Sequence, residues 1–233
     1  MARDFAGTLA RVASIGYREV EFAGYFDWRP EEVKGILDRN GLAAPSAHVP
    51  IEIGRRNWAG ALDVANAIGH RYVVVPWLPE EDRGTLDDYK RVADEFNRLG
   101  AEAKRAGIRF AYHNHDFEFV PVEGQVPYDV LLERADPAVV DLELDLYWAT
   151  KAGHDPREMM ASHPGRFPLV HVKDSGGPPE HVQVDVGAGT IDFRAIFRAA
   201  GGSVRHAFVE HDQPADPWAF AETSLSGYRK LGT

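Results

Sequence analysis

The chain of 233 residues is long enough for one large domain, and 44% of its residues are hydrophobic, which suffices for a sizeable core. Its net charge of -10 disfavours nucleic acid as a partner, and the absence of cysteine excludes disulfides and thiolate metal sites. The sequence contains no apolar run long enough for a membrane span, and its first residues lack the apolar core of a signal peptide. We therefore expect a single domain over residues 1–233, cytoplasmic and without a membrane partner.

Helix-like and strand-like segments alternate along the chain, beginning with a helix over residues 4–15. Seven strands are predicted, at 18–25, 42–50, 71–79, 108–119, 139–149, 167–174 and 204–212. Each is followed by a predicted helix, at 30–40, 59–68, 86–106, 128–134, 154–163, 191–200 and 216–231. This alternation predicts parallel strands that are joined by crossover helices.

Nearly every predicted strand ends in polar or aromatic residues. They are Glu21, His48, Trp77, His113 with His115, Asp145, His171 with Lys173, and Glu210 with His211. Barrel enzymes collect their active sites at the carboxyl ends of the strands, so this pattern favours a (β/α)8 TIM barrel over an open doubly wound sheet. Because only seven strands are visible and the chain begins on a helix, we expect an α/β barrel that lacks its first strand.

Histidines and carboxylates are the most informative of these strand-end residues. Residues two apart on a strand point to the same face, so His113 and His115 share one face, as do His171 and Lys173. Imidazole and carboxylate ligands without thiolate suit manganese, cobalt, iron, nickel or zinc. Two imidazoles and two carboxylates from four strand ends are the predicted ligands of one divalent metal ion: His113, Asp145, His171 and Glu210.

Several segments resemble the xylose isomerase-like TIM barrels, the sugar phosphate isomerase/epimerase group. The resemblance extends from Asp4 to the C-terminus, and its carriers are IGYREVEFAGYF, APSAHVP, YHNHDFEF, LELDLYWATKAG, PLVHVKD, VGAGTIDF and FVEHD. The combination of YHNHDFEF with HVKD looks like a bacterial subgroup of that family. The resemblance also implies that a first strand precedes the segment at which this chain begins.

The resemblance implies a metal site like that of the family, in which a glutamate, an aspartate, a histidine and a second glutamate from successive strands hold the metal. The last three positions match Asp145, His171 and Glu210, whereas His113 stands where the first glutamate is expected. We expect manganese at this site, with cobalt, zinc, iron, nickel or magnesium as alternatives.

The resemblance implies a metal-dependent isomerase or epimerase that acts through an enediolate on a small ketose, a sugar phosphate or a related carbohydrate. Glu210 matches one acid/base group of such enzymes. The alternative on the same metal site is a keto-sugar lyase or dehydratase, or a 3-keto-glycoside hydrolase. Its general acid would be His115, Lys173 or Glu118. The alternative of another class is a non-catalytic carbohydrate-binding barrel.

Four further residues are expected to contact the substrate: His48, Trp77, Trp148 and Glu21. The two tryptophans would offer an apolar wall to a sugar face, although aromatic side chains also serve core packing. The expected partner is a small carbohydrate and not nucleic acid. Because an open barrel exposes strand edges, a homodimer is also considered.

Overall fold

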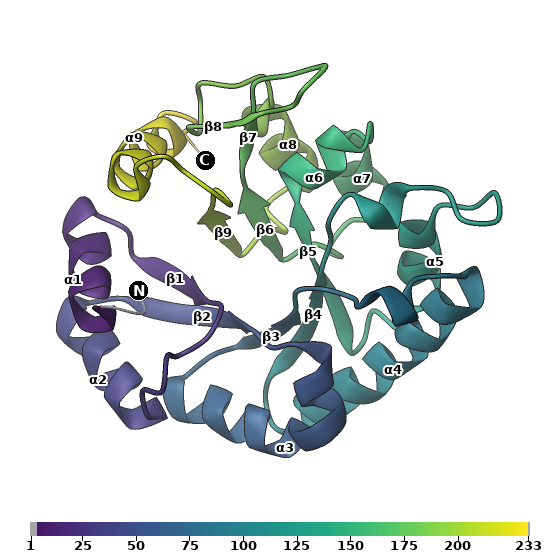
Figure 1. Cartoon of the computed structure of the whole chain (residues 1–233), viewed down its shortest axis with the longest axis horizontal. Coiled ribbons are helices and arrows are strands. Elements are labelled where there is room, and N and C mark those ends of the chain that lie inside the picture. Colours follow the sequence, from purple (N-terminus) through teal and green to yellow (C-terminus); the bar gives the residue numbers. More distant parts are fainter. Residues whose placement is uncertain (1–3, 233) are drawn as a thin grey trace. The chain divides into compact units, whose positions relative to one another are not determined.

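The computed structural model describes residues 4–232, and its contacts divide the chain into two compact units. The first unit extends to His113 and includes Glu118–Asp141. The second comprises Asn114–Phe117 and the chain from Leu142 onwards. Within each unit, strands and helices alternate as the sequence predicts (Figure 1).

Four parallel strands form the sheet of the first unit. They pair in chain order and are β1 (Glu19–Phe22), β2 (Ala43–His48), β3 (Tyr72–Val75) and β4 (Arg109–His113). The helices of this unit are α1 (Phe5–Ile15), α2 (Pro30–Asn40), α3 (Ile51–Ile68), α4 (Leu86–Arg105) and α5 (Pro127–Arg134). Two short 3-10 helices are η1 (Glu80–Asp82) and η2 (Phe117–Phe119), the second at the boundary between the units.

Three parallel strands continue the pattern toward the C-terminus. They pair in the order β5 (Val140–Asp145), β6 (Leu169–Val172) and β9 (His206–Val209). The helices are α6 (Leu146–Lys151), α7 (Pro156–Ser162), α8 (Phe193–Ala200) and α9 (Pro217–Arg229). Two short antiparallel strands, β7 (Asp174–Ser175) and β8 (Gln183–Val184), form a hairpin directly after β6.

The number of strands agrees with the sequence. Residues 4–232 contain four strands in the first parallel set and three in the second, which matches the seven predicted. In the same range no helix is long and apolar enough to cross a membrane.

Helix boundaries follow capping residues. Asp4 caps α1, because its Oδ1 accepts the backbone N–H of Gly7 at 2.8 Å. Gly16 ends the same helix with φ 115°, a left-handed conformation that glycine adopts without steric cost. Thr85 and Asp88 form a reciprocal capping box at the start of α4.

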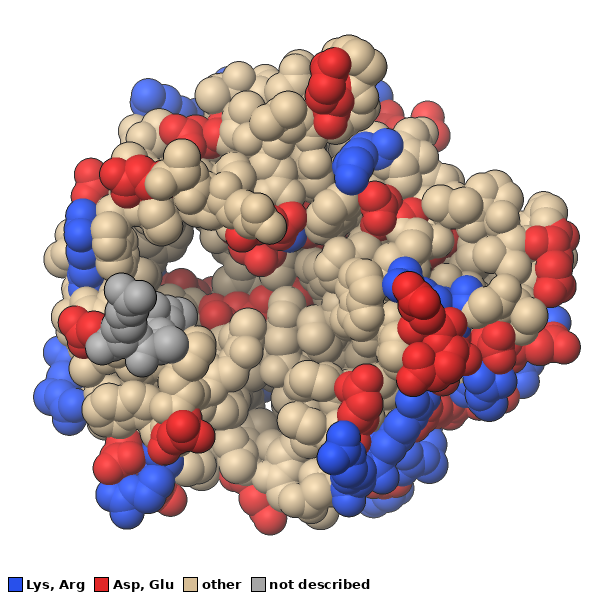
Figure 2. Space-filling view, in the orientation of Figure 1, with Lys and Arg blue, Asp and Glu red and all other residues tan. Residues whose placement is uncertain are grey.

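Helix α4 separates charged from apolar residues. Acidic and basic side chains intermingle over this helix in Figure 2, and the ion pairs include Arg98–Glu102 and Arg91–Asp88, both at 2.8 Å. Exposed pairs of this kind contribute little to stability, because solvent screens the two charges. The apolar face, which includes the fully buried Phe96, therefore does more to hold α4 on its sheet.

Several element boundaries differ from the prediction, among them those of two strands and one helix. The strand expected over 108–119 ends at His113, and the strand expected over 139–149 ends at Asp145, because Asp145 caps α6 there. The helix expected at 59–68 begins at Ile51 and is interrupted at Asn57, whose φ of -155° is not helical. The hairpin of β7 and β8 was not predicted, because each strand has only two residues and is too short to show an alternation of apolar and polar side chains.

A buried histidine in the first unit makes stability dependent on pH. The hydroxyl of Tyr25 donates to Nε2 of His70 at 2.9 Å, and Nδ1–H of His70 donates to the carbonyl of Ala44 at 2.6 Å. Both ring nitrogens of the neutral imidazole thus have a hydrogen-bond partner. Burial lowers the pKa of His70, and its bond to Ala44 offsets only part of that effect.

We expect the protein to lose stability below about pH 6.5, the ordinary pKa of histidine. In that range the unfolded chain binds a proton at residue 70, whereas the folded chain, with its lowered pKa, does not. Melting temperatures between pH 7.5 and 5 check this, with His70→Gln for comparison. The wild type should lose more of its melting temperature over this interval than the variant, and equal losses would contradict the assignment.

Candidate metal centre

Asp145 is held rigidly at the junction between β5 and α6. Its Oδ1 accepts the backbone N–H groups of Tyr147 and Trp148, both at 2.9 Å. Its own backbone N–H donates to Oδ1 of Asn114 at 3.0 Å. The residue is fully buried, and Oδ2 lies 4.0 Å from Nδ1 of His171. The α6 cap therefore fixes one carboxylate oxygen and directs the other toward His171.

His171 and Glu210 complete a cluster with Asp145. The register between β5 and β6 places His171 opposite Asp145. Nδ1 of His171 contacts Oε2 of Glu210, the residue that follows β9. One donor atom from each of the three residues lies within 4.8 Å of the other two. Three of the four predicted ligands are thus brought together in the second unit.

Glu143 orients the imidazole of His171 from the other side. Its Oε2 lies 3.2 Å from Nε2 of His171, and both side chains are buried. With the Nε2 proton shared with Glu143, Nδ1 can direct its lone pair toward a cation. Carboxylate partners of this kind fix the tautomer of metal-binding histidines and raise their basicity.

Lys173 brings one positive charge into this acidic cluster. Only 2% of the residue is exposed, and Nζ lies 3.1 Å from Oδ2 of Asp145, 3.0 Å from Oε2 of Glu210 and 2.9 Å from Oδ1 of Asp212. Burial acts against the charge of Lys173, but the three carboxylates outweigh it and raise the lysine pKa above its ordinary value. The ammonium is therefore present at neutral pH.

The donor set fits a divalent cation. Glu143, Asp145 and Glu210 supply three carboxylates around His171, and Asp212 adds a fourth beside Lys173, whereas Lys173 supplies a single ammonium. An imidazole nitrogen and two carboxylate oxygens that face one another at these distances need a proton or a cation between them. Asp145, His171 and Glu210 would hold this cation, and nitrogen and oxygen donors suit first-row transition metals.

The role of Glu143 leads to a test. Glu143→Leu is expected to weaken metal binding by about 10- to 100-fold, because His171 loses the group that fixes its tautomer. Glu143→Gln should retain much of the affinity, since an amide oxygen still accepts the Nε2 proton. Isothermal titration with Mn²⁺ checks both variants, and equal affinity for Glu143→Leu and the wild type would contradict the role.

Three predicted site residues lie together in the first unit. Nε2 of His48 pairs with Oε2 of Glu21 at 2.9 Å, and the hydroxyl of Ser46 donates to Oε1 of Glu21 at 2.6 Å. The rings of His48 and His113 are 5.3 Å apart between centroids. Trp77 is 44% exposed instead, with the guanidinium of Arg83 4.6 Å from its ring centroid.

Glu118 occupies a buried pocket of aromatic side chains in the first unit. The residue has no exposed surface, and the hydroxyl of Tyr112 donates to its Oε1. Burial and then the charge of Glu118 raise the pKa of Tyr112 well above its usual range. These contacts anchor Glu118 inside the first unit, and its role as a general acid stays a prediction from the sequence.

His115 and Trp148 pack against each other in the second unit. The ring of His115 is stacked on Phe117 at 5.8 Å, and its centroid lies 5.6 Å from that of Trp148. Nζ of Lys151 lies 4.4 Å from the Trp148 ring, and Nζ of Lys173 lies 5.7 Å from it. Trp148 is therefore positioned among cationic and aromatic groups next to the cluster of Asp145, His171 and Glu210.

Four residues around the cluster were not assigned from the sequence: Asn114, Glu143, Gln183 and Asp212. The alternation of LELDLYW places Glu143 on the same face as Asp145, so its proximity to the site could have been inferred. Gln183 lies in the hairpin of β7 and β8, and no sequence pattern connects it with residue 212.

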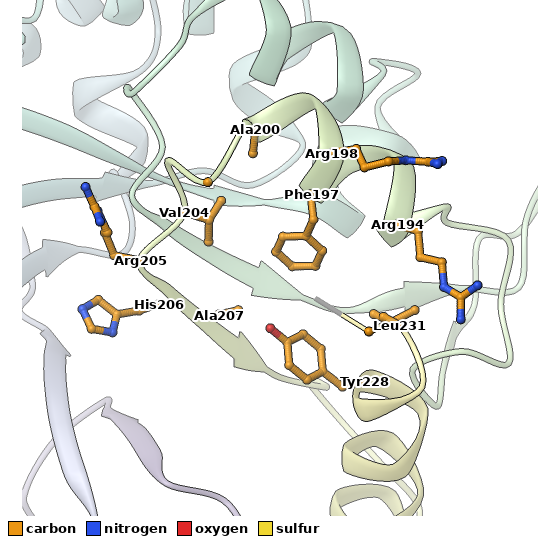
Figure 3. A pocket seen from close by; sticks show the side chains of 12 residues that line it. Arg194, Phe197, Arg198, Ala200, Val204, Arg205, His206, Ala207, Tyr228 and Leu231 are labelled. Carbon is orange, nitrogen blue, oxygen red and sulfur yellow. The ribbon is translucent and has the colours of Figure 1, made fainter.

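A pocket of about 490 Å³ lies elsewhere in the second unit. It is formed by α8, the start of β9 and the end of α9, and Figure 3 shows Phe197 and Tyr228 facing each other within it. Figure 3 also shows Arg194 and Arg198 extending away from these rings. None of the predicted site residues lines this pocket, so it is separate from the candidate metal centre.

Parallel strands are joined by crossover helices, and a cluster of histidine and carboxylates lies at the strand ends. These features define a TIM-barrel protein with candidate ligands for a divalent metal. The family model described as "Xylose isomerase-like TIM barrel" matches residues 9–209. The chain belongs to this family, as the sequence motifs indicate.

Named relatives are consistent with a sugar-modifying enzyme family. The chain is 23% identical to the inosose dehydratase of Lacticaseibacillus casei over 249 residues, covering 91% of this chain and 83% of that protein. A crystal structure of a sugar phosphate isomerase/epimerase from Parabacteroides distasonis is 29% identical, with a TM-score of 0.83 over 96% of this chain and 87% of that one. The fold is also shared with the IOLI protein with a bound zinc atom, which is 17% identical with a TM-score of 0.75, over 98% and 92% of the two chains.

Proposed function

We propose that this protein is a divalent-metal-dependent enzyme that acts on an uncharged keto-sugar or keto-polyol. The observation that carries the proposal is the buried cluster of Asp145, His171 and Glu210 beside the ammonium of Lys173. A metal ion bound by these residues would polarise the substrate carbonyl and make the neighbouring C–H acidic.

Glu210 and Lys173 are the proposed proton-transfer groups. The side chain of Glu210 is 41% exposed, so it can reach a substrate, and it lies 3.0 Å from the ammonium of Lys173. Glu210 takes the proton from the carbon next to the carbonyl, and the released electron pair forms the double bond of an enediolate. Lys173 is the only ammonium that contacts the cluster in the second unit as described, and it can donate a proton to a leaving hydroxyl.

We infer dehydration as the overall reaction. The C–H bond breaks as Glu210 accepts the proton, and the β C–O bond breaks as Lys173 protonates the hydroxyl, which leaves as water. The proton on Glu210 then passes to solvent and Lys173 is reprotonated. The pairing of one carboxylate base with one ammonium acid supports this reaction, and so does the similarity to inosose dehydratases over 91% of the chain.

Isomerisation or epimerisation is the second candidate. It begins with the same proton abstraction but returns a proton to carbon, and no leaving group departs. The similarity to the isomerase/epimerase of Parabacteroides distasonis, at 29% identity, favours it. The two candidates differ in whether water is released.

Charge favours an uncharged substrate over a sugar phosphate. The four carboxylates of Glu143, Asp145, Glu210 and Asp212 exceed the ammonium of Lys173 by three charges, and a divalent cation would leave a net charge of about -1. Nearby Lys151 is already paired with Asp116 at 3.2 Å. A phosphate dianion would therefore be repelled.

A substrate panel tests the proposal. The Mn²⁺-loaded protein is incubated in D₂O with inososes and ketoses, each beside its phosphate ester, and NMR records carbon-bound deuterium and water loss. We expect an uncharged compound to be dehydrated. Reaction of phosphate esters alone would contradict the charge argument, and the absence of any C–H exchange would contradict the enzymatic proposal.

The remaining sequence assignments enter the proposal unchanged. His113 is proposed as a fourth ligand, and His113→Ala should then weaken Mn²⁺ binding in the same titration. Glu21, His48, Trp77 and Trp148 are proposed substrate contacts. His115 and Glu118 are alternative general acids. Manganese, a cytoplasmic location and a homodimer remain predictions.

A further inference from the structure

The ammonium of Lys173 and the proposed metal ion would share the same carboxylate oxygens. Lys173 contacts Oδ2 of Asp145 and Oε2 of Glu210, and these residues are proposed metal ligands. Two cations at one pair of oxygens repel each other, and a buried ammonium is costly unless it is paired. Lys173 therefore needs a third carboxylate that does not bind the metal.

Asp212 meets this requirement. Its Oδ1 lies 2.9 Å from Nζ of Lys173, and its side chain is 38% exposed. Asp212 is not part of the cluster of candidate ligands formed by Asp145, His171 and Glu210. It can keep its bond to Lys173 while the other two carboxylates bind a metal.

Gln183 holds Asp212 from two directions. Its Oε1 accepts the backbone N–H of Asp212 at 2.9 Å, and its Nε2 donates to Oδ2 of the same residue. This arrangement needs one acceptor and one donor on a single planar group, which an amide supplies and a carboxylate does not. Oδ1 of Asp212 is thereby left for Lys173.

The hairpin that carries Gln183 is itself fastened in place. Gln183 in β8 pairs with Ser175 in β7. The neighbouring carboxylate of Asp174 is buried and accepts the backbone N–H groups of Ser175 and Gly187, both at 2.8 Å. The hydroxyl of Tyr147 donates to the carbonyl of His181 at 2.6 Å. These contacts hold the hairpin, and with it Gln183, in place beside Asp212.

We propose that Asp212, held by Gln183, is the positioning residue that retains the Lys173 ammonium beside the metal centre and limits its competition with the metal. This inference rests on the proposed metal-dependent function. It assigns to the hairpin of β7 and β8 a role that the ligand set alone does not contain.

A double-mutant cycle with Mn²⁺ titration tests the inference. Asp212→Asn should weaken Mn²⁺ binding by about tenfold, because Lys173 then relies on Asp145 and Glu210 alone. In the background of Lys173→Met the same substitution should have little effect, since no ammonium competes. Gln183→Glu should resemble Asp212→Asn, and the exposed neighbour Gln213→Glu serves as the matched control.

The outcomes separate the inference from the proposed function. An equal loss of affinity from Asp212→Asn with and without Lys173 would overturn the inference, as would no loss at all, whereas the wild type would still bind Mn²⁺. A wild type that binds no divalent metal would overturn both. Circular dichroism of each variant shows whether it is folded.

Discussion

Asp145→Asn is expected to give a folded protein that has lost both its metal and its activity. Asparagine can still accept the backbone N–H groups of Tyr147 and Trp148, so α6 remains capped. The substitution removes a negative charge from the oxygen that faces His171. Because metal polarisation contributes several kcal/mol to such reactions, turnover should fall by about 10²- to 10⁴-fold.

Asp155→Asn is the matched control for this prediction. Asp155 also caps a helix in the second unit, α7, and its Oδ1 accepts the backbone N–H of Arg157. Metal content by elemental analysis and turnover should be unchanged in Asp155→Asn. If Asp145→Asn retained a full equivalent of metal, Asp145 would not be a ligand.

Lys173→Met is expected to separate catalysis from metal binding. Methionine fills most of the buried space without the charge, so the proposed general acid is removed. We expect kcat to fall by about 10²- to 10⁴-fold, the usual contribution of general acid–base catalysis. Mn²⁺ affinity should be retained or increased, because the ammonium no longer competes for Asp145 and Glu210.

In contrast to its metal affinity, the thermal stability of metal-free Lys173→Met should be lower than that of the wild type. Without Lys173, the buried carboxylate of Asp145 lacks its nearest cation, so the metal-free variant should melt at a lower temperature than the metal-free wild type. Adding Mn²⁺ should reduce this difference. Unchanged kcat in a folded Lys173→Met variant would exclude Lys173 as the general acid and leave His115 and Glu118 as the candidates.

Much of the fold could be predicted because its signals are local. Gly16 ends α1, Pro30 begins α2, and the apolar run at Val73–Val75 forms the buried part of β3. Their positions at the ends of predicted parallel strands also placed Asp145 and His171 at one edge of the sheet, and the register between β5 and β6 confirms that they are opposite each other.

The parts that could not be predicted depend on long-range contacts. The strand expected to run through Glu118 ends earlier, at His113. The rule that residues two apart point to the same face therefore does not apply beyond His113. The burial of Glu118 against Tyr112 follows from the local fold after β4, which sequence alternation does not describe. Likewise, the bond between Gln183 and Asp212 joins residues 29 positions apart, without a shared pattern.

The most direct test of the account is the metal content of the purified wild-type protein, measured by elemental analysis after dialysis against buffer with trace Mn²⁺. We expect one equivalent of a divalent transition metal per chain, and its loss in Asp145→Asn and in His171→Ala. A folded wild-type protein that retains no metal under these conditions would contradict the claim that Asp145, His171 and Glu210 form a metal centre.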